Sequence, residues 1–229
     1  LEATRALARP RAPEEYRRAI NVMQQENDHM TRLINDLLAL ARADIDHNTM
    51  HRGNVDLSEI VLDVAERLES LAQLSCMTIR IDPLPELLVP GDQTSVTQMV
   101  TNIVENSLKY GAGFATHVRI SGGYRHNGDI AGVWLRVSDD GPGIAEEHLP
   151  HLCERFYRVD TARTHRDGGA LGDGSAEIEP AGSGLGLAIV RAIVRSHQGD
   201  ISIQSQLGMG TVCEVWLPKG KGAASPNHW

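Results

Sequence analysis

Apolar side chains recur at alternating steps of three and four residues along the N-terminal part of the chain. Counting Asn27 with them, the positions are Tyr16, Ile20, Met23, Asn27, Met30, Ile34, Leu37 and Ala41. These steps form a heptad repeat, and because residues 14–43 contain no Gly or Pro, they predict one long helix with a single apolar seam. A helix cannot bury its own seam. We therefore expect its partner to be a short helix at 1–9 or a second copy of the chain.

A different pattern begins after a break at 47–56, which predicts a linker. Beyond it, segments with helical periodicity alternate with segments of strand character. The predicted helices are 58–74, 95–110 and 184–199, and the predicted strands are 76–82, 115–123, 131–138, 201–206 and 210–218. Residues 159–183 predict a long loop and residues 219–229 a frayed tail. The fold class is therefore predicted to be α+β, with a helical segment at 1–46 and one mixed domain at 57–218.

Composition narrows the kind of partner. The formal net charge is −8, whereas a nucleic-acid surface needs a basic stripe, so we expect no nucleic-acid partner. Cys76, Cys153 and Cys213 form no CxxC pair, which favours buried reduced thiols in a cytosol over a zinc site. No stretch approaches the roughly 20 apolar residues of a membrane helix. We expect a soluble portion, which could be cut from a longer protein.

The predicted helix at 95–110 carries the first candidate chemistry. Asn102, Glu105, Asn106 and Lys109 lie three or four residues apart and therefore share one face of this helix. Amide oxygens suit a hard cation such as magnesium, which binds few protein ligands and completes its shell with phosphate oxygens and water. A nearby lysine would neutralise phosphate charge. A solvated helix face is the alternative, and for such a motif taken alone it is the more frequent one.

A Gly-rich turn follows the predicted strand at 131–138. In the segment VSDDGPGI, Gly141 and Gly143 allow a tight turn and a close approach of the backbone to a ligand. An ionised Asp139 at the strand end would accept a hydrogen bond from the exocyclic amine of adenine and reject guanine, which presents an oxygen there. An Asp-Gly-Pro-Gly turn without a ligand is the alternative.

A second Gly-rich segment, GSGLGLAIV at 182–190, runs directly into a predicted helix. Free backbone N–H groups and the helix dipole make such a start a binding site for phosphate. A dinucleotide-binding fingerprint would need a strand immediately before this segment, but the loop at 159–183 stands there instead. A P-loop would need a GK[ST] sequence, which this segment lacks.

The order and spacing of these three motifs resemble the ATP-binding domain of sensor histidine kinases, within the GHKL superfamily that includes gyrase, Hsp90 and MutL. ERFYRVD at 154–160 looks like the F box of the kinases, and HQGDISIQSQLGMGTVCEVWLP is similar to their closing strands. The seam helix resembles the second helix of their dimerisation and phosphotransfer domain. The resemblance extends from about Glu14 to Pro218. It implies a two-layer Bergerat-type fold, with a mixed sheet and helices on one face.

The resemblance also implies roles for the residues that match these motifs. ATP would be bound by Asn102, Asn106, Lys109, Tyr110, Asp139, Gly141, Gly143, Tyr157, Arg158, Gly182, Ser183, Gly184, Leu185, Gly186 and Leu187. Among them, Asn106 would hold Mg²⁺ and Asp139 would read adenine. Glu105 would orient the attacking imidazole or accept its proton. The loop at 159–183 would be a lid, and it is longer than the family leads us to expect.

The activity that the resemblance implies is that of an ATP-dependent protein-histidine kinase of a two-component system. Such a kinase passes its phosphoryl group to the receiver domain of a response regulator. Residues 1–46 would be part of the phosphotransfer hairpin, which implies a homodimer through a helical bundle. The family is commonly anchored in a bacterial membrane, with this portion in the cytoplasm. The alternatives are a non-catalytic ATP-sensing module and another GHKL ATPase, such as a clamp or chaperone.

The phosphoacceptor histidine is where the chain departs from the family. It should lie in a stretch resembling H-E-x-R-T-P-L, which does not occur here. His29 lies on the seam helix, and His47 and His51 lie in the predicted linker, so none of them fits. We therefore expect the acceptor to precede Leu1.

Overall fold

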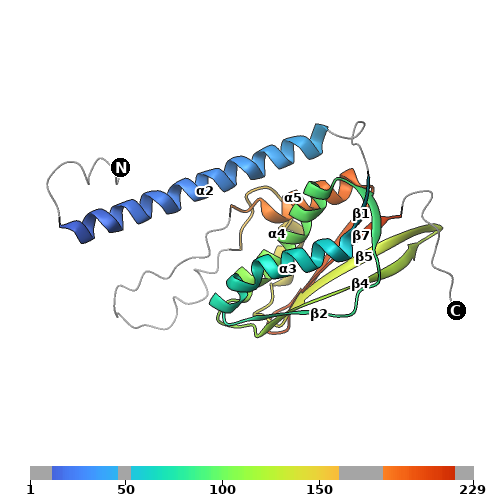
Figure 1. Cartoon of the computed structure of the whole chain (residues 1–229). Coiled ribbons are helices and arrows are strands. Elements are labelled where there is room, and N and C mark those ends of the chain that lie inside the picture. The colour runs from blue at the N-terminus through green and yellow to red at the C-terminus, as the bar shows by residue number, and fades with distance from the viewer. Residues whose placement is uncertain (1–11, 46–52, 160–182, 220–229) are drawn as a thin grey trace.

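The computed structural model describes residues 12–45, 53–159 and 183–219. Within these ranges a long helix, α2 (Pro13–Ile45), lies beside a domain in which helices cover one face of a sheet (Figure 1). The expected helix at 1–9 and nearly all of the loop at 159–183 and the tail at 219–229 lie outside the described residues. None of the described helices is both long enough and apolar enough to cross a membrane.

In its described residues the domain has three α-helices, and the first two begin at capping aspartates. The three are α3 (Leu57–Leu74), α4 (Gln93–Gly111) and α5 (Gly186–Ser196), with a 3₁₀ helix η1 (Glu146–His151) between the last two. Asp56 accepts from the backbone N–H of Ser58 at 2.9 Å, and Asp92 accepts from that of Ser95 at 2.8 Å. Such N-caps satisfy donors that have no partner inside the helix. The three predicted helices are confirmed, whereas η1 was not predicted.

In the described ranges, seven strands form two sheets. They are β1 (Gly53–Asp56), β2 (Thr78–Ile81), β3 (Leu88–Gly91), β4 (His117–Asn127), β5 (Ile130–Asp139), β6 (Asp200–Gln206) and β7 (Gly210–Pro218). The larger sheet has the order β2-β4-β5-β7-β6, and only its β2–β4 pair is parallel. The mixed sheet with helices on one face confirms the predicted α+β class.

The smaller sheet corrects the sequence interpretation. Strands β1 and β3 pair antiparallel, so the last four residues of the expected linker at 47–56 belong to a strand, and 88–91 had been assigned to no element. Strand β1 has the sequence GNVD and β3 the sequence LVPG, and their Gly, Asn, Asp and Pro residues are typical of turns rather than strands. The β4–β5 hairpin also turns more tightly than expected, because Asn127 already pairs with Ile130.

The core lies between the helices and the sheet face that they cover. Side chains at most 2% exposed include those of Val96, Met99, Val100, Ile103, Val104 and Leu108 in α4, Val133, Leu135 and Val137 in β5, and Ile189, Val190 and Val194 in α5. The opposite sheet face carries charge: Glu214 pairs with Arg125 and Arg136, each at 2.6 Å. Burial of one face of α4 fixes the rotation of this helix and hence the direction of its polar face.

Helix α2 packs on α5 and lies over the helical layer of the domain (Figure 1). Leu40 is buried in the core cluster, and Leu33 packs against that cluster while partly buried. The predicted seam lies on another face, where Ile34 is 57% and Leu37 49% exposed. The described chain therefore leaves the seam without a partner.

The cysteines follow the sequence prediction only in part. All three are free thiols, but Cys213 alone is buried, whereas Cys153 is half-buried and Cys76 is exposed. The expectation that all three are buried is therefore wrong.

Candidate nucleotide site

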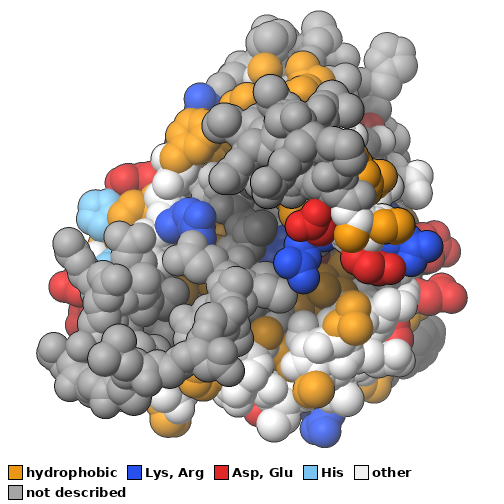
Figure 2. All heavy atoms as spheres, turned by 90° about the vertical axis from the view of Figure 1, so that its left-hand side faces the viewer, with side chains coloured by type: hydrophobic (Ala, Val, Ile, Leu, Met, Phe, Trp, Pro, Cys, Tyr) orange, Lys and Arg blue, Asp and Glu red, His pale blue; other side chains and the backbone are white. Residues whose placement is uncertain are grey.

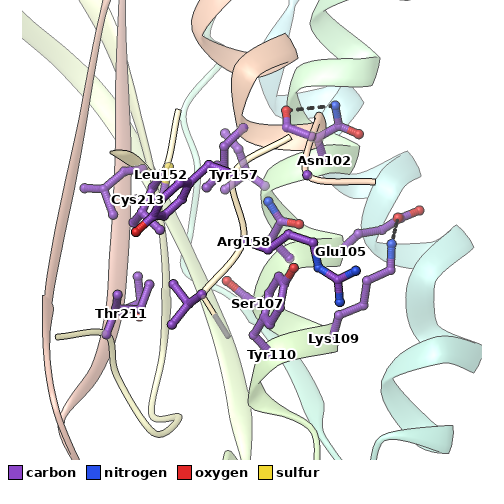
Figure 3. A pocket seen from close by; sticks show the side chains of 18 of the residues that line it. Asn102, Glu105, Ser107, Lys109, Tyr110, Leu152, Tyr157, Arg158, Thr211 and Cys213 are labelled. Atoms are coloured by element: carbon purple, nitrogen blue, oxygen red, sulfur yellow. Dashed lines mark hydrogen bonds and ion pairs between the residues drawn. The ribbon is translucent and has the colours of Figure 1, made fainter. Parts of the chain in front are cut away.

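A pocket of about 330 Å³ lies between α2, α4, the start of α5 and the strand ends of the sheet (Figure 3). Its lining includes most of the residues selected from the sequence: Asn102, Glu105, Asn106, Lys109, Tyr110, Asp139, Gly143, Tyr157, Arg158, Ser183, Gly184, Gly186 and Leu187. Three motifs that are far apart in the chain are thus brought to one cavity. Figure 2 shows a face of the molecule on which acidic and basic side chains border a hollow.

The polar face of α4 meets the start of α5. The side-chain amide of Asn102 donates to the carbonyl oxygen of Gly186 at 3.3 Å. Asn106 also lies beside Gly186, since a methyl group added at Gly186 would be 3.6 Å from the Nδ2 atom of Asn106. One turn further along α4, Lys109 and Glu105 form an ion pair at 2.7 Å. Amide and charged groups are therefore concentrated around the N-terminus of α5.

The N-terminus of α5 lacks a side-chain cap on its N-cap residue, Leu185. The preceding turn is held by Ser183, whose Oγ accepts from the N–H of Leu185 at 3.2 Å. Gly184 has φ +69°, and its carbonyl oxygen accepts from the N–H of Phe156 at 2.9 Å. Since an added Cβ at Gly184 would lie 2.8 Å from the Phe156 carbonyl carbon, the turn requires glycine. An uncapped helix start in a cavity is suited to binding phosphate.

Asp139 lies at the end of β5, in the floor of the pocket. Its Oδ1 accepts from the N–H groups of Gly141 at 3.0 Å and Thr211 at 3.2 Å. Burial raises the pKa of this carboxyl, while the bonds from Gly141, Ser107 and Thr211 oppose the rise. A half-buried carboxylate held in this way is a selective hydrogen-bond acceptor for a ligand.

Some predicted residues have a structural reason of their own. Gly143 has φ +71°, and an added Cβ would overlap the carbonyl oxygen of Gln206, so glycine is needed for packing on the β6–β7 turn. Gly141 and Leu185 do not line the pocket, and Leu185 is fully buried in the core. Gly182 lies outside the described residues.

An aromatic residue, Tyr157, and a basic residue, Arg158, reach the pocket from the segment after η1. Tyr157 shares a hydrogen bond of 2.8 Å with His148 Nδ1, and its ring centroid lies 5.4 Å from that of His151. Arg158 follows it in the pocket lining. The two histidines were not selected from the sequence, because no spacing links them to Tyr157 before the segment is folded.

Other lining residues were also missed. They are Arg32, Leu33 and Asp36 from α2, Ile103 and Ser107 from α4, Pro142, Ile144, Leu152 and Val159 from the segment after β5, and Ile203, Thr211 and Cys213 from β6 and β7. Figure 3 shows Leu152, Thr211 and Cys213 on the side of the pocket opposite Asn102, Glu105 and Lys109. The pocket therefore has a charged end at α5 and a more apolar end at the sheet. A ligand with an anionic end and a flat apolar end, such as a nucleotide, matches this division.

The donor set also fits magnesium held jointly with a phosphate ligand. Among the described residues, no group of three or more His, Cys, Asp or Glu side chains is arranged to hold a metal ion. A magnesium ion that takes one protein ligand and otherwise phosphate oxygens and water needs no such group. The side-chain oxygen of Asn106, beside the start of α5, is of the kind that would serve as that single ligand.

Comparisons with known proteins agree with this geometry. Residues 91–221 match the family described as "Histidine kinase-, DNA gyrase B-, and HSP90-like ATPase", and residues 1–45 match the "His Kinase A (phospho-acceptor) domain". The chain is 33% identical over 201 residues to the sensor histidine kinase WalK of Bacillus subtilis (strain 168), covering 88% of this chain and 30% of that protein. It is 34% identical over 214 residues to the sensor histidine kinase YkoH of the same strain, covering 92% and 41%.

A solved structure extends the likeness to the fold. Full-length ShkA in complex with AMPPNP has a TM-score of 0.70 and 24% identity, over 94% of this chain and 41% of that one. The chain spans less than half the length of the curated relatives WalK and YkoH.

Proposed function

Because the chain belongs to the histidine kinase-, DNA gyrase B- and HSP90-like ATPase family, as a two-component sensor histidine kinase core, we propose that its pocket binds ATP with Mg²⁺ and donates the γ-phosphoryl group to a histidine. The supporting observation is that the polar face of α4 meets the uncapped start of α5 in a pocket whose other end contains Asp139. The AMPPNP complex of ShkA agrees with a nucleotide ligand.

Each end of the pocket has a separate task in this proposal. The N–H groups at the start of α5 and the amine of Lys109 hold the phosphates, and Asn106 provides the protein ligand of Mg²⁺. Bound Mg²⁺ would offset the charge of the phosphate oxygens. Asp139 accepts a hydrogen bond from the exocyclic amine of adenine, and Ile203 and Cys213 line the apolar end that receives the base.

Glu105 is assigned to the attacking histidine. In the structure its carboxylate is paired with Lys109 at 2.7 Å. When Lys109 turns toward phosphate, Glu105 becomes free to orient the imidazole or accept its proton. A Glu105→Gln variant should therefore bind ATP within about threefold of wild type and transfer phosphate at least about 100-fold more slowly. Full transfer activity in this variant would remove the role.

The partners follow from the same proposal. The exposed seam of α2 pairs with the first bundle helix and with a second copy, which gives a homodimer. The phosphohistidine then passes its phosphoryl group to the receiver domain of a response regulator. We place this portion on the cytoplasmic side of a membrane-anchored sensor.

Transfer is tested on the protein extended N-terminally through the first bundle helix. Incubation with γ-labelled ATP and Mg²⁺ should give label that is acid-labile and alkali-stable. Asn106→Ala should reduce this label at least about tenfold because it removes the proposed metal ligand. Asn127→Ala, at the exposed end of β4, should keep it and serves as the matched control. Binding of ATP without label would favour the non-catalytic sensor, and absence of binding would exclude both functions.

A further inference from the structure

Helix α2 belongs to the segment outside the ATPase family match, yet it forms one wall of the pocket. Arg32, Leu33 and Asp36 all line the cavity. Leu33, Asp36 and Leu40 are spaced by three and four residues and share the face that docks on the domain. Asp36 is therefore an acidic group that the docked α2 adds to a site suited to phosphate.

Asp36 is bonded directly to the turn that begins α5. The hydroxyl of Ser183 donates to Asp36 Oδ2 at 3.0 Å, across 147 positions of sequence. The same Ser183 oxygen accepts from the N–H of Leu185 at 3.2 Å. One hydroxyl thus connects the carboxylate of α2 to the segment that presents the N–H groups of α5. A phosphate bound at those groups would lie next to an acidic side chain.

The charges around Asp36 come from two elements, α4 and α2. On α4, Lys109 favours the ionised form of Asp36 and Glu105 disfavours it, and Arg32 on α2 itself favours it. Burial is the largest influence and raises the pKa of Asp36, as expected for a carboxylate with incomplete compensation. In the docked arrangement, Lys109 is shared between two acids, Glu105 by ion pairing and Asp36 by longer-range attraction.

We propose that Asp36 is an affinity-determining residue that opposes nucleotide binding while α2 is docked, so that docking of α2 and binding of nucleotide phosphates disfavour each other. The carboxylate repels the phosphates, competes for Lys109 and occupies the hydroxyl of Ser183. By linkage, nucleotide weakens the docking of α2 by the same factor as docking weakens nucleotide binding. This inference rests on the proposed nucleotide site and adds an element from outside the ATPase domain to it.

The alternative role for Asp36 is that of a passive anchor between α2 and α5. The two roles differ in the effect of charge alone. Asp36→Asn keeps the size of the side chain and its ability to accept from Ser183, but removes the repulsion of phosphate. If Asp36 were a passive anchor, this variant would bind nucleotide with unchanged affinity. If Asp36 were a ligand of Mg²⁺, the variant would bind MgATP more weakly than wild type.

The test is titration calorimetry of MgATP against this chain and its Asp36→Asn variant. The variant should bind MgATP about fivefold or more tightly than wild type, within the usual range of coupling between sites. Asp28→Asn is the matched control, since Asp28 is exposed on α2 two turns earlier and does not line the pocket. Equal affinity in wild type and Asp36→Asn, or weaker binding in the variant, would overturn the proposal.

A second readout follows α2 itself. Saturating MgATP should raise the hydrogen-exchange rate of amides in 30–40 of wild type, and Asp36→Asn should show a smaller response. Exchange that does not change with nucleotide would also overturn the proposal. Failure of wild type to bind MgATP would overturn the nucleotide site as well, whereas binding without an effect of Asp36 would overturn the α2 coupling alone.

Discussion

Helices α4 and α2 both present polar side chains to the same pocket, but they are attached to the protein in different ways. The apolar face of α4 is enclosed in the core, with Met99 and Leu108 fully buried. In contrast, α2 is a longer helix that buries little of its apolar surface. Among its described side chains, the buried hydrophobic ones are Ala19 and Leu40. Ile20 and Met30 are each 53% exposed.

This difference separates two properties of the site. The residues of α4 are held by the same packing that stabilises the fold, so the geometry of their wall is fixed as long as the domain is folded. The wall that α2 provides depends on a narrow apolar contact at Leu33 and Leu40 and on the Ser183–Asp36 hydrogen bond. The α2 wall can therefore leave the pocket without unfolding of the domain.

The largest expected effect is on the free energy of unfolding when α4 loses a core side chain. Ile103 is 2% exposed and packs in the core, so Ile103→Ala should reduce that free energy by about 2–5 kcal/mol through lost burial and a cavity. Urea denaturation followed by circular dichroism measures it. A loss below about 1 kcal/mol would mean that α4 is not held by the core.

Asp139→Asn should weaken the binding of MgADP by about tenfold, because a hydrogen bond to a charged group is lost. Its pKa is raised by burial, so in wild type the affinity should already fall as the pH drops through a value above the ordinary 3.8, where the carboxylate gains a proton. The affinity ratio of the two proteins should therefore shrink toward one at acidic pH. Calorimetric titrations across pH check this, and a ratio independent of pH would contradict it.

The same substitution should not cost stability at neutral pH. A carboxyl with a raised folded-state pKa contributes stability below its ordinary pKa, and this contribution is lost as the pH rises through the folded value. Replacing the ionised Asp139 by a neutral amide should thus leave the melting temperature at pH 7 equal or higher. A clearly lower melting temperature would show that the carboxylate is held for structure rather than for a ligand.

Leu40→Ala should have a smaller effect than its burial suggests. Leu40 is only 3% exposed, but α2 can undock while the domain remains folded, which limits the loss to about 1 kcal/mol in the unfolding free energy of the domain. Chemical denaturation compares it directly with Ile103→Ala. Equal losses in the two variants would show that α2 unfolds only together with the domain.

The smallest effect is expected on the seam. Ile34 is 57% exposed, so Ile34→Ala should change the unfolding free energy of the single chain by less than about 0.5 kcal/mol.

A substitution of Ile34 should instead affect assembly, because the seam is proposed to pair with other bundle helices. Analytical ultracentrifugation of the N-terminally extended protein should show a weaker dimer for Ile34→Asp than for Gln25→Asp, an exposed position outside the predicted heptad set.

The sequence predicted the parts of the site in which local pattern and final position coincide. The polar face of α4 is determined by its spacing, since Asn102, Glu105 and Lys109 lie opposite a buried face in any amphipathic helix. The Gly-rich start of α5 was found for the same reason, because Gly184 has a local need for positive φ. These residues reached the pocket as expected, although their roles in binding remain predictions.

The contribution of α2 could not be found in this way. Its heptad pattern is dominated by the seam, whereas Leu33 and Asp36 lie on another face and become part of the site only when the helix packs on α5. The hydrogen bond between Ser183 and Asp36 joins residues at a long sequence separation, for which one sequence contains no signal. Strands β1 and β3 were missed because their Gly, Asn, Asp and Pro residues are typical of turns, whereas the equally short β2 contains none of these.

The measurement that tests the nucleotide site most directly is calorimetric titration of ATP into this chain with and without Mg²⁺, for wild type and Asn106→Ala. Wild type should bind one ATP per chain with an affinity that rises when Mg²⁺ is added. Asn106→Ala should lose this gain, with an affinity for MgATP at least about tenfold weaker than that of wild type. Equal affinities of the two proteins for MgATP would contradict the assignment of Asn106 and the polar face of α4 to the phosphates.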